Sequence, residues 1–482
     1  MTYTNPILKG DYSDPDVIRV GTDYYMIASS FTYLPGIPVL TSKDLVSWRQ
    51  IGNAAYRLPL AAYDKPMHKN GTWAPSIRFH NGLFYVYMCM PDDGLFCFTA
   101  QDPAGAWEAH YVKDVCGWID PCPLFDGDEV YLVHGFAASR CGINNLLYIH
   151  RLSADGLSVL DKGRLVYDGF NFGDTTVEGP KLYKRSGYYY IFCPAGGVEA
   201  GYQLALRSKN IYGPYERRVV LKQGSTPING PHQGGWVDTG RGQDWFIHFQ
   251  DVNEYGRIPH LQPVKWVDDW PIMGINGEPV LEYAVPDTGF TSEMGLKMSD
   301  DFSGALKPEW QFQANPDAGR YALLKPGLRL HANDVPNPFE AAGFLSKLMQ
   351  AFDFTMETRV SVKGDCAAGI CMMGYDFNYI ALENGKASLV SGTGIDMGRN
   401  RPAKSSTSIV EQITVSGAEA VLEMRVKQGK YSFYINGSPI GGVYKMSKGG
   451  WTGARPGIFC IGKAGFADFD GVRFTDESGK QI

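Results

Sequence analysis

Residues 178–193 read EGPKLYKRSGYYYIFC, and three other segments of the chain share their pattern. These segments are DPDVIRVGTDYYMIAS at 14–29, WAPSIRFHNGLFYVYM at 73–88 and DPCPLFDGDEVYLVHG at 120–135. Each has an apolar residue four positions after its first residue, then a polar turn with Gly or Asp, and a second apolar run ten positions after the first residue. This order of features predicts a strand, a hairpin turn and a second strand.

A fifth copy, HQGGWVDTGRGQDWFIHFQ at 232–250, fits the pattern with about two extra turn residues. The copies begin 59, 47, 58 and 54 residues apart, so each unit has room for further strands such as YQLALRS at 202–208. Four strands per unit, repeated at this period, are typical of a β-propeller blade. The sequence therefore predicts an all-β protein with five blades that end near Leu281, and it has no helical pattern between strands that would favour an α/β fold.

Equivalent positions of successive blades surround one axis, so the first residues of the five copies are expected at one height around the central channel. These residues are Asp14, Trp73, Asp120, Glu178, and His232 or Gln233. Three carboxylates, an aromatic ring and an imidazole are therefore expected to converge on one site.

Converging carboxylates suit glycoside hydrolysis, which needs a protonated acid for the leaving oxygen and an ionised base that activates water. A third carboxylate can tune or orient the acid. The alternative is that each acidic residue caps a turn beside Pro or Gly. Three acids at one position of the repeat make that alternative less favourable. Asp16 shares a strand face with Asp14 and is the alternative for the base.

Composition limits the other functions. The net charge is −6 with no basic run, which argues against nucleic acid and anionic membrane surfaces as partners. No apolar run has the length of a membrane span, and the first residues lack a signal segment. The nine cysteines form no CxxC pair. This favours reduced thiols and a cytoplasmic location, with secretion after removal of a signal as the alternative.

Five motifs, in chain order, resemble glycoside hydrolase family 43: NPILKGDYSDPDVI (5–18), WAPSI (73–77), GWIDPCPLFD (117–126), TVEGPKLY (176–183) and GPHQGGWVDT (230–239). The resemblance extends over about residues 5–285. It implies a five-bladed propeller and an inverting enzyme for xylans, xylo-oligosaccharides or arabinans, with no organic cofactor. It also implies that Asp14 is the general base, that Asp120 tunes and orients the proton donor, and that Glu178 is the general acid.

Other residues are candidates for binding the sugar. Trp73 shares the repeat position of the acids, so its ring is expected to stack on a sugar, with core packing as the alternative. The resemblance implies that Phe31 lines the sugar subsite and that Arg257 binds sugar hydroxyls near the base. A guanidinium at Arg257 can also hold Asp14 ionised, and a solvated loop arginine is the alternative. His260, three residues after Arg257, is a further candidate for substrate binding.

The resemblance also implies a metal near the axis, because the family counterpart of His232 often lies beside a bound calcium that keeps waters as ligands. Calcium prefers oxygen ligands, so an imidazole would be one member of a mostly aqueous shell. The alternative for His232 is a hydrogen-bonded structural role.

The repeat stops near residues 286–290, and new material follows the segment TSEMGLKMSDDFSG. Phe354 and Met356 alternate with polar residues, as do Leu422, Met424 and Val426, and KQGK predicts a hairpin turn. These strands indicate a β-sandwich. DDFSG and AGFADFDGVRF resemble the concanavalin-like sandwich of family β-xylosidases, which implies residues 1–290 as the catalytic propeller and 291–482 as the sandwich.

In that group the sandwich helps close the pocket and supports contacts between copies of the chain, which implies a homo-oligomer and favours an exo-acting enzyme. The sequence thus predicts an inverting exo-glycosidase on oligosaccharides, a β-xylosidase with α-L-arabinofuranosidase as a second activity of the same pocket. An arabinanase on the same scaffold and a non-catalytic carbohydrate-binding propeller remain the alternatives.

Overall fold

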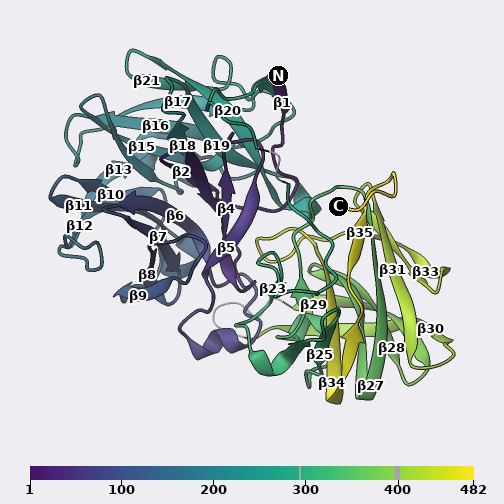
Figure 1. Ribbon diagram of the computed structural model, residues 1–482. Coiled ribbons are helices and arrows are strands. Elements are labelled where there is room, and N and C mark those ends of the chain that lie inside the picture. The colour runs from purple at the N-terminus through teal and green to yellow at the C-terminus, as the bar shows by residue number, and fades with distance from the viewer. Residues whose placement is uncertain (293–294, 396–401) are drawn as a thin grey trace.

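The computed structural model describes residues 1–292, 295–395 and 402–482, and in these residues the chain is built almost entirely of strands (Figure 1). Helical segments in the described ranges are single turns of three or four residues. They are η1 (Ala61–Asp64), α1 (Ala138–Cys141), η2 (Gly169–Phe172), η3 (Asn253–Tyr255), η4 (Ala318–Arg320) and η5 (Pro338–Glu340). The predicted all-β class is confirmed.

Residues 16–273 form five antiparallel sheets of four strands each, with the strands of every sheet in chain order. Blade 1 has β2 (Asp16–Val20), β3 (Asp23–Ile27), β4 (Gly36–Ser42) and β5 (Arg49–Ala55), and blade 2 has β6 (Trp73–His80), β7 (Leu83–Met90), β8 (Gly94–Ala100) and β9 (Glu108–Lys113). Blade 3 has β10 (Trp118–Asp126), β11 (Glu129–Phe136), β12 (Leu146–Leu152) and β13 (Arg164–Asp168). Blade 4 has β14 (Lys181–Arg185), β15 (Tyr188–Ala195), β16 (Tyr202–Ser208) and β17 (Glu216–Lys222), and blade 5 has β18 (His232–Asp238), β19 (Asp244–Asp251), β20 (Arg257–Val267) and β21 (Trp270–Met273).

The blades close into a ring through their first strands. The strands β2, β6, β10 and β14 contact one another in turn, and β18 of the last blade contacts both blade 4 and β2 of the first. Apolar side chains of adjacent blades interleave, as Ile27 and Val39 do with Ile77 and Val86. The chain start adds a further tie, because β1 (Thr2–Thr4) pairs with β22 (Glu282–Ala284) after the last blade. The predicted five-bladed propeller is confirmed.

The hairpins show which positions of the blades are equivalent. In the first four blades the first strand reaches a two-residue turn after Val20, His80, Asp126 and Arg185. Six residues before these positions lie Asp14, Ala74, Asp120 and Gly179, with φ angles of 55°, 31°, 57° and 58°. Asp14 and Asp120 are therefore equivalent, as predicted. Trp73 and Glu178 lie one residue earlier than the position equivalent to Asp14, so the predicted alignment is wrong by one residue in blades 2 and 4.

The C-terminal domain is one sheet of thirteen strands that folds around its own core. Its strands are β23 (Gln311–Phe312), β24 (Tyr321–Leu323), β25 (Leu328–His331), β26 (Leu345–Ser346), β27 (Phe354–Met373), β28 (Asp376–Glu383), β29 (Lys386–Ile395), β30 (Lys404–Thr414), β31 (Glu419–Lys427), β32 (Lys430–Ile435), β33 (Ser438–Lys445), β34 (Arg455–Phe469) and β35 (Arg473–Thr475). The long strand β27 pairs with β31 along its first part and with β28 along its last part. The expected alternation is confirmed, since Phe354, Met356, Leu422, Met424 and Val426 are all buried in this core.

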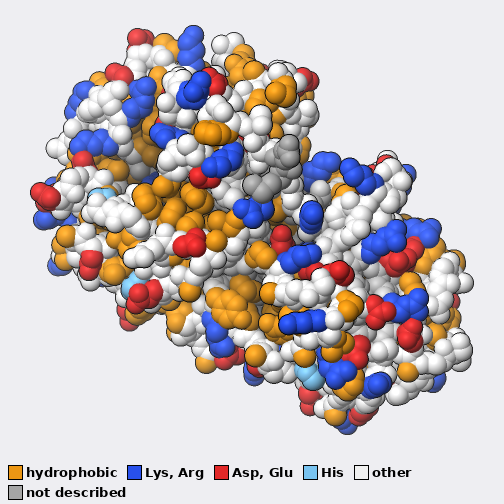
Figure 2. Space-filling view, viewed as in Figure 1, with side chains coloured by type: hydrophobic (Ala, Val, Ile, Leu, Met, Phe, Trp, Pro, Cys, Tyr) orange, Lys and Arg blue, Asp and Glu red, His pale blue; other side chains and the backbone are white. Residues whose placement is uncertain are grey.

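The two domains are joined by specific contacts beside blade 1. The backbone of Leu34 exchanges hydrogen bonds with that of Phe312, at 2.6 and 2.7 Å. The Arg455 guanidinium of the C-terminal domain lies 3.8 Å from the ring centre of Tyr33. Charges of both signs are interspersed on the face shown in Figure 2. In the described ranges, no helix has the length and apolar character needed to cross a membrane.

Candidate active site

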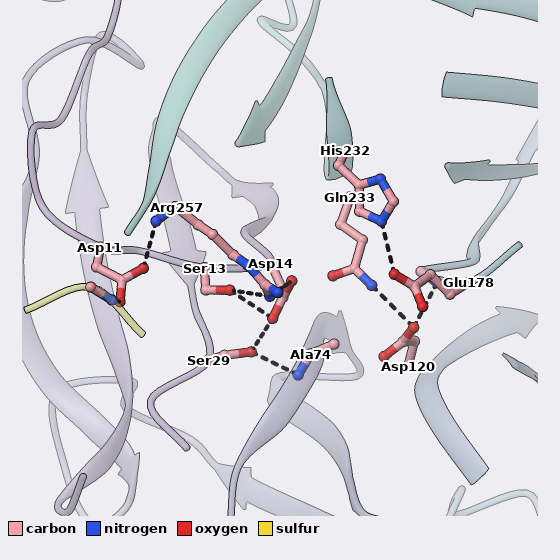
Figure 3. Close-up of polar contacts among 12 residues, drawn as sticks. Asp11, Ser13, Asp14, Ser29, Ala74, Asp120, Glu178, His232, Gln233 and Arg257 are labelled. Carbon is pink, nitrogen blue, oxygen red and sulfur yellow. Dashed lines mark hydrogen bonds and ion pairs between the residues drawn. The ribbon is translucent and has the colours of Figure 1, made fainter. Parts of the chain in front are cut away.

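Asp14 lies at the start of blade 1 and its carboxylate accepts from three donors (Figure 3). Ser13 Oγ is 2.9 Å and Ser29 Oγ is 2.6 Å from Asp14 Oδ2. Arg257 Nη1 is 3.3 Å from Asp14 Oδ1 and 3.0 Å from Ser13 Oγ. An ionised carboxylate only accepts hydrogen bonds, so this set of donors matches a charged Asp14.

Asp120 and Glu178 lie together on the facing side of the same space (Figure 3). Asp120 Oδ2 accepts from the Gly179 backbone N–H at 2.6 Å and from Gln233 Nε2 at 3.1 Å. Glu178 Oε1 is 2.9 Å from His232 Nε2. The predicted convergence of the three carboxylates is therefore present, with donors from blade 5 holding the Asp120–Glu178 side.

Burial separates the two acids of this pair. Asp120 is 2% exposed, whereas the side chain of Glu178 is 26% exposed. Burial raises the pKa of Asp120 well above its ordinary value, and the negative charges of Glu178 and then Asp14 raise it further. The Gly179 N–H and the Lys181 ammonium act in the opposite direction. Asp120 therefore keeps a proton to higher pH than an isolated aspartic acid would.

Asp16, the alternative base, serves the structure elsewhere. Its side chain is fully buried, and Asp16 Oδ2 accepts from the Ile77 N–H at 2.9 Å and from Arg78 Nη1 at 2.8 Å. The other oxygen, Oδ1, accepts from the Val17 N–H at 3.1 Å. These contacts tie blade 1 to blade 2 and leave Asp14 as the acid that faces the other two.

Aromatic rings from both domains surround Trp73. The ring of Phe31 meets Trp73 edge-on, with 6.3 Å between the ring centres, and Trp451 of the C-terminal domain does so at 6.1 Å. The Arg140 guanidinium lies 5.4 Å from the Trp73 ring centre. Phe31 is buried and Trp73 is partly exposed, so of these two predicted residues only Trp73 presents a substantial surface to a ligand.

A pocket of about 310 Å³ adjoins the Asp14 side of the site. Its lining combines both domains: Lys69, Val198, Glu199, Asp251, Asn253, Gly256 and Arg257 come from the propeller, and Tyr375, Lys448, Gly449, Trp451 and Thr452 come from the C-terminal domain. Arg257 thus lines the pocket while its guanidinium contacts Asp14. A larger cavity, about 690 Å³, is lined by the outer strands of blade 5 and does not include these residues, so its size does not make it the site.

The two predicted histidines differ in their surroundings. His260 is 2% exposed and stacks on His248 at 5.6 Å. Burial, and then His248, lower the pKa of His260 well below its ordinary value. Its ring nitrogens have no hydrogen-bond partner in the described part of the chain. The structure does not bring His260 to the pocket lining, and its role in binding substrate stays a prediction.

In the part of the chain that the structure describes, only one ring nitrogen of His232 has a hydrogen-bond partner. Nε2 faces Glu178, whereas Nδ1 is buried and lacks a hydrogen-bond partner among the residues described, as does Gln233 Oε1 nearby. Two such buried acceptors fit a polar occupant such as water or a hydrated ion. Across the described ranges, no group of three or more His, Cys, Asp or Glu side chains is arranged to hold a metal directly. The residues thus fit calcium through a shell of waters and not through a cage of side chains.

Both domains match families of known proteins. The sequence model of glycosyl hydrolases family 43 matches residues 3–271, and that of the β-xylosidase C-terminal concanavalin A-like domain matches residues 299–475. The chain belongs to glycosyl hydrolase family 43.

Relatives support the assignment over the whole chain. A protein of Xylanibacter ruminicola with the provisional name β-xylosidase is 40% identical over 95% of this chain and 86% of its own length. A non-reducing end α-L-arabinofuranosidase of Bacteroides ovatus is 30% identical over 98% of this chain and 94% of its own. A solved family 43 structure from Bacteroides ovatus superposes with a TM-score of 0.83 at 26% identity, covering 99% of this chain and all of that one.

Sequence reasoning missed several residues of this family 43 site. Ser13 and Ser29 were not expected, and they contact Asp14 because the Ser29 N–H bonds to the Ser13 carbonyl at 2.8 Å. Asp11 and Trp451 were also not expected. The motif KGDYSDPD contains Asp11 and Ser13 beside Asp14, which is the signal that could have indicated them.

Proposed function

We propose that this family 43 chain is an inverting exo-glycosidase that releases xylose and arabinose from xylo-oligosaccharides and arabinoxylan fragments. The observation that carries the proposal is the placement of Asp14 opposite the Asp120–Glu178 pair, with each side held by its own donors. An inverting reaction needs two carboxyl groups on opposite sides of the sugar, far enough apart for a water molecule.

Asp14 is proposed as the general base. Its carboxylate, held by Ser13, Ser29 and Arg257, takes a proton from water as the water oxygen attacks the anomeric carbon. The C–O bond to the leaving group breaks in the same step. Arg257 also lines the pocket, so its remaining donors are available to sugar hydroxyls.

Glu178 is proposed as the general acid. It is the more exposed of the two acids in the Asp120–Glu178 pair and so is the one that can pass a proton to the departing oxygen. Asp120 stays buried beside it, bound by the Gly179 N–H and by Gln233. His232 orients the Glu178 carboxyl through the 2.9 Å contact at Nε2. Trp73 is proposed as the surface on which the sugar stacks, with Phe31 packed behind it.

The substrate class rests on the relatives and on the pocket. The names of the two relatives above give xylosidase and arabinofuranosidase activity. A pocket whose wall includes Trp451 and Tyr375 of the second domain suits removal of a terminal sugar better than an open groove does. This favours the exo-enzyme over an arabinanase.

Calcium is proposed near His232 on the unpartnered Nδ1 and Gln233 Oε1, which would contact it through water. When bound, the ion would supply positive charge at the start of blade 5. Location in the cytoplasm and assembly into a homo-oligomer stay predictions.

The test is hydrolysis of p-nitrophenyl β-xyloside and α-L-arabinofuranoside, followed by proton NMR of the first sugar released. The proposal expects α-xylose as the first product from the β-xyloside, and loss of turnover in Asp14→Ala and Glu178→Ala. Retention of configuration would refute the mechanism. Internal fragments from long arabinan would support the arabinanase, and sugar binding without hydrolysis by the unmodified chain would support the carbohydrate-binding propeller.

A further inference from the structure

Asp11 is a buried carboxylate that joins the two domains at the edge of the site (Figure 3). It is 7% exposed and precedes blade 1. Asp11 Oδ1 accepts from the backbone N–H of Arg257 at 2.8 Å, and Oδ2 accepts from that of Gly453 at 2.8 Å. One carboxylate thus holds one backbone amide from the propeller and one from the C-terminal domain.

The first of these amides belongs to the residue that contacts Asp14. The Arg257 guanidinium reaches Asp14 and Ser13 from the start of β20. The preceding Gly256 has φ of 84°, and a Cβ there would lie 2.4 Å from the Asp11 Cγ atom. The backbone before Arg257 is therefore packed against Asp11. This contact fixes the backbone position from which the Arg257 side chain extends.

The second amide belongs to the loop that carries Trp451. Gly453 follows Trp451 by two residues, and a Cβ on Gly453 would lie 2.6 Å from the carbonyl carbon of Tyr255. The next residue, Ala454, donates its backbone N–H to the Glu254 carbonyl at 2.7 Å. This loop therefore docks on the propeller turn before Arg257, and it holds Trp451 against Trp73.

The position is costly for a charge. Burial raises the pKa of Asp11 to about 6, although the Arg257 and Gly453 amides and the Arg257 and Arg455 guanidinium groups lower it. The phenol of Tyr33 also faces this group of charges. A buried carboxylate is a weak source of stability, so its two amide contacts are better explained by the geometry they impose.

We propose that Asp11 is a positioning residue that couples the C-terminal domain to the catalytic carboxylate, fixing Arg257 on Asp14 and Trp451 on Trp73 at the same time. This inference rests on the proposed glycosidase function. An asparagine keeps the size of Asp11 but has one acceptor oxygen, and its NH₂ group would face an N–H donor. In Asp11→Asn the backbone N–H of either Arg257 or Gly453 therefore loses its hydrogen bond to residue 11.

The experiment compares Asp11→Asn with Asp44→Asn. Asp44 is also buried and also binds backbone amides through both oxygens: Oδ1 accepts from Val46 at 2.9 Å and Ser47 at 2.7 Å, and Oδ2 accepts from Ser292 at 2.9 Å. It lies outside the site. Loss of a hydrogen bond to a charged group predicts that kcat/KM of Asp11→Asn on p-nitrophenyl β-xyloside falls about ten- to hundred-fold. Asp44→Asn should keep kcat/KM within about two-fold of the unmodified chain, because it touches no group of the site.

A second readout does not depend on catalysis. Acrylamide quenching of tryptophan fluorescence should increase in Asp11→Asn, because release of the loop separates Trp451 from Trp73 and exposes both rings further. The increase should be absent when Asp11→Asn is made in a chain that carries both Trp73→Phe and Trp451→Phe. In the unmodified chain the same quenching should rise as pH falls through about 6, where Asp11 gains a proton. Unchanged kcat/KM in a folded Asp11→Asn, or no quenching transition in the unmodified chain, overturns the inference. An unmodified chain that cleaves neither glycoside refutes the proposed function instead, and the quenching result still decides the coupling.

Discussion

Replacement of Ser29 by alanine tests whether the donors around Asp14 matter for catalysis. The Ser29 hydroxyl donates to Asp14 Oδ2 at 2.6 Å and accepts from the Ala74 backbone N–H at 2.7 Å. Ser29→Ala removes both contacts and leaves the buried Ala74 N–H without this acceptor. Ser13 and Arg257 still bind Asp14, so the substitution makes the position of the base less fixed but does not remove the base.

The two contacts give two separate magnitudes. A hydrogen bond donated to a charged group contributes about 1.5–3 kcal/mol. If that contribution is lost in the transition state, kcat/KM falls about 10- to 150-fold, at a tenfold change for about 1.4 kcal/mol. The unpartnered Ala74 N–H lowers the free energy of unfolding by about 1–3 kcal/mol. Ser29→Ala is thus expected to remain folded while it loses activity.

The matched control is Ser42→Ala in the same blade. The Ser42 hydroxyl also donates to a carboxylate, Asp44 Oδ1 at 3.0 Å, and accepts from the backbone N–H of Leu45 at 2.9 Å. It should lose stability by a similar amount with little change in kcat/KM on p-nitrophenyl β-xyloside. The reasoning fails if Ser29→Ala keeps its kcat/KM, or if Ser42→Ala loses as much activity as Ser29→Ala at the same stability.

Three further predictions concern stability. Arg78→Met leaves the buried Asp16 carboxylate without its ion-pair partner and should lower the free energy of unfolding in urea by about 3–5 kcal/mol. The control Arg241→Met removes an exposed ion pair with Asp287 and should lower it by less than about 1 kcal/mol. Equal losses would contradict this prediction. Burial lowers the pKa of His248 from 6.5 to about 4, so its contribution is complete above pH 6.5 and is lost as pH falls toward 4. Between pH 7.5 and 5.5 the free energy of unfolding of His248→Phe should therefore fall by about 1.3 kcal/mol less than that of the unmodified chain. The same pH dependence of unfolding in both proteins would count against this prediction. Removal of calcium with EDTA should lower the thermal midpoint and CaCl₂ should restore it, a response that His232→Ala should abolish; an EDTA-insensitive midpoint would argue against the metal.

The propeller was predictable because its signals are local. Each hairpin needs only an apolar strand, a short turn and a second strand, and all of these lie within sixteen residues of sequence. The prediction aligned the copies by the start of the second apolar run, and neighbouring apolar residues can be aligned one position apart without disturbing the pattern. The two turn residues fix the alignment, and this explains the one-residue error in blades 2 and 4. The turns stand at residues 21–22, 81–82, 127–128 and 186–187, and counting back from them identifies Ala74 and Gly179 as the equivalents of Asp14.

The site was predictable only in part. Carboxylates in the repeated motifs could be named, because an acid beside a strand start is unusual and its chemistry is specific. The donors that hold them could not, because serine and glutamine are common and their contacts depend on three-dimensional packing. Trp451 reaches Trp73 from a different domain, nearly 380 residues along the chain, and no local pattern records such a contact.

The offset of one residue between Asp120 and Glu178 explains how two neighbouring repeat positions supply two different acids. In blade 3 the residue with positive φ is Asp120 itself, and its short side chain is directed into the buried space where Gly179 and Gln233 bind it. In blade 4 that backbone position is Gly179, where a Cβ would lie 2.4 Å from the Gln233 side chain. Glycine there leaves Gln233 room to reach Asp120, and it moves the acid one residue back to Glu178, which is longer and more exposed. A repeat that placed both acids at the same position would bury both, so the departure from exact repetition is what gives the pair one member that can reach a substrate.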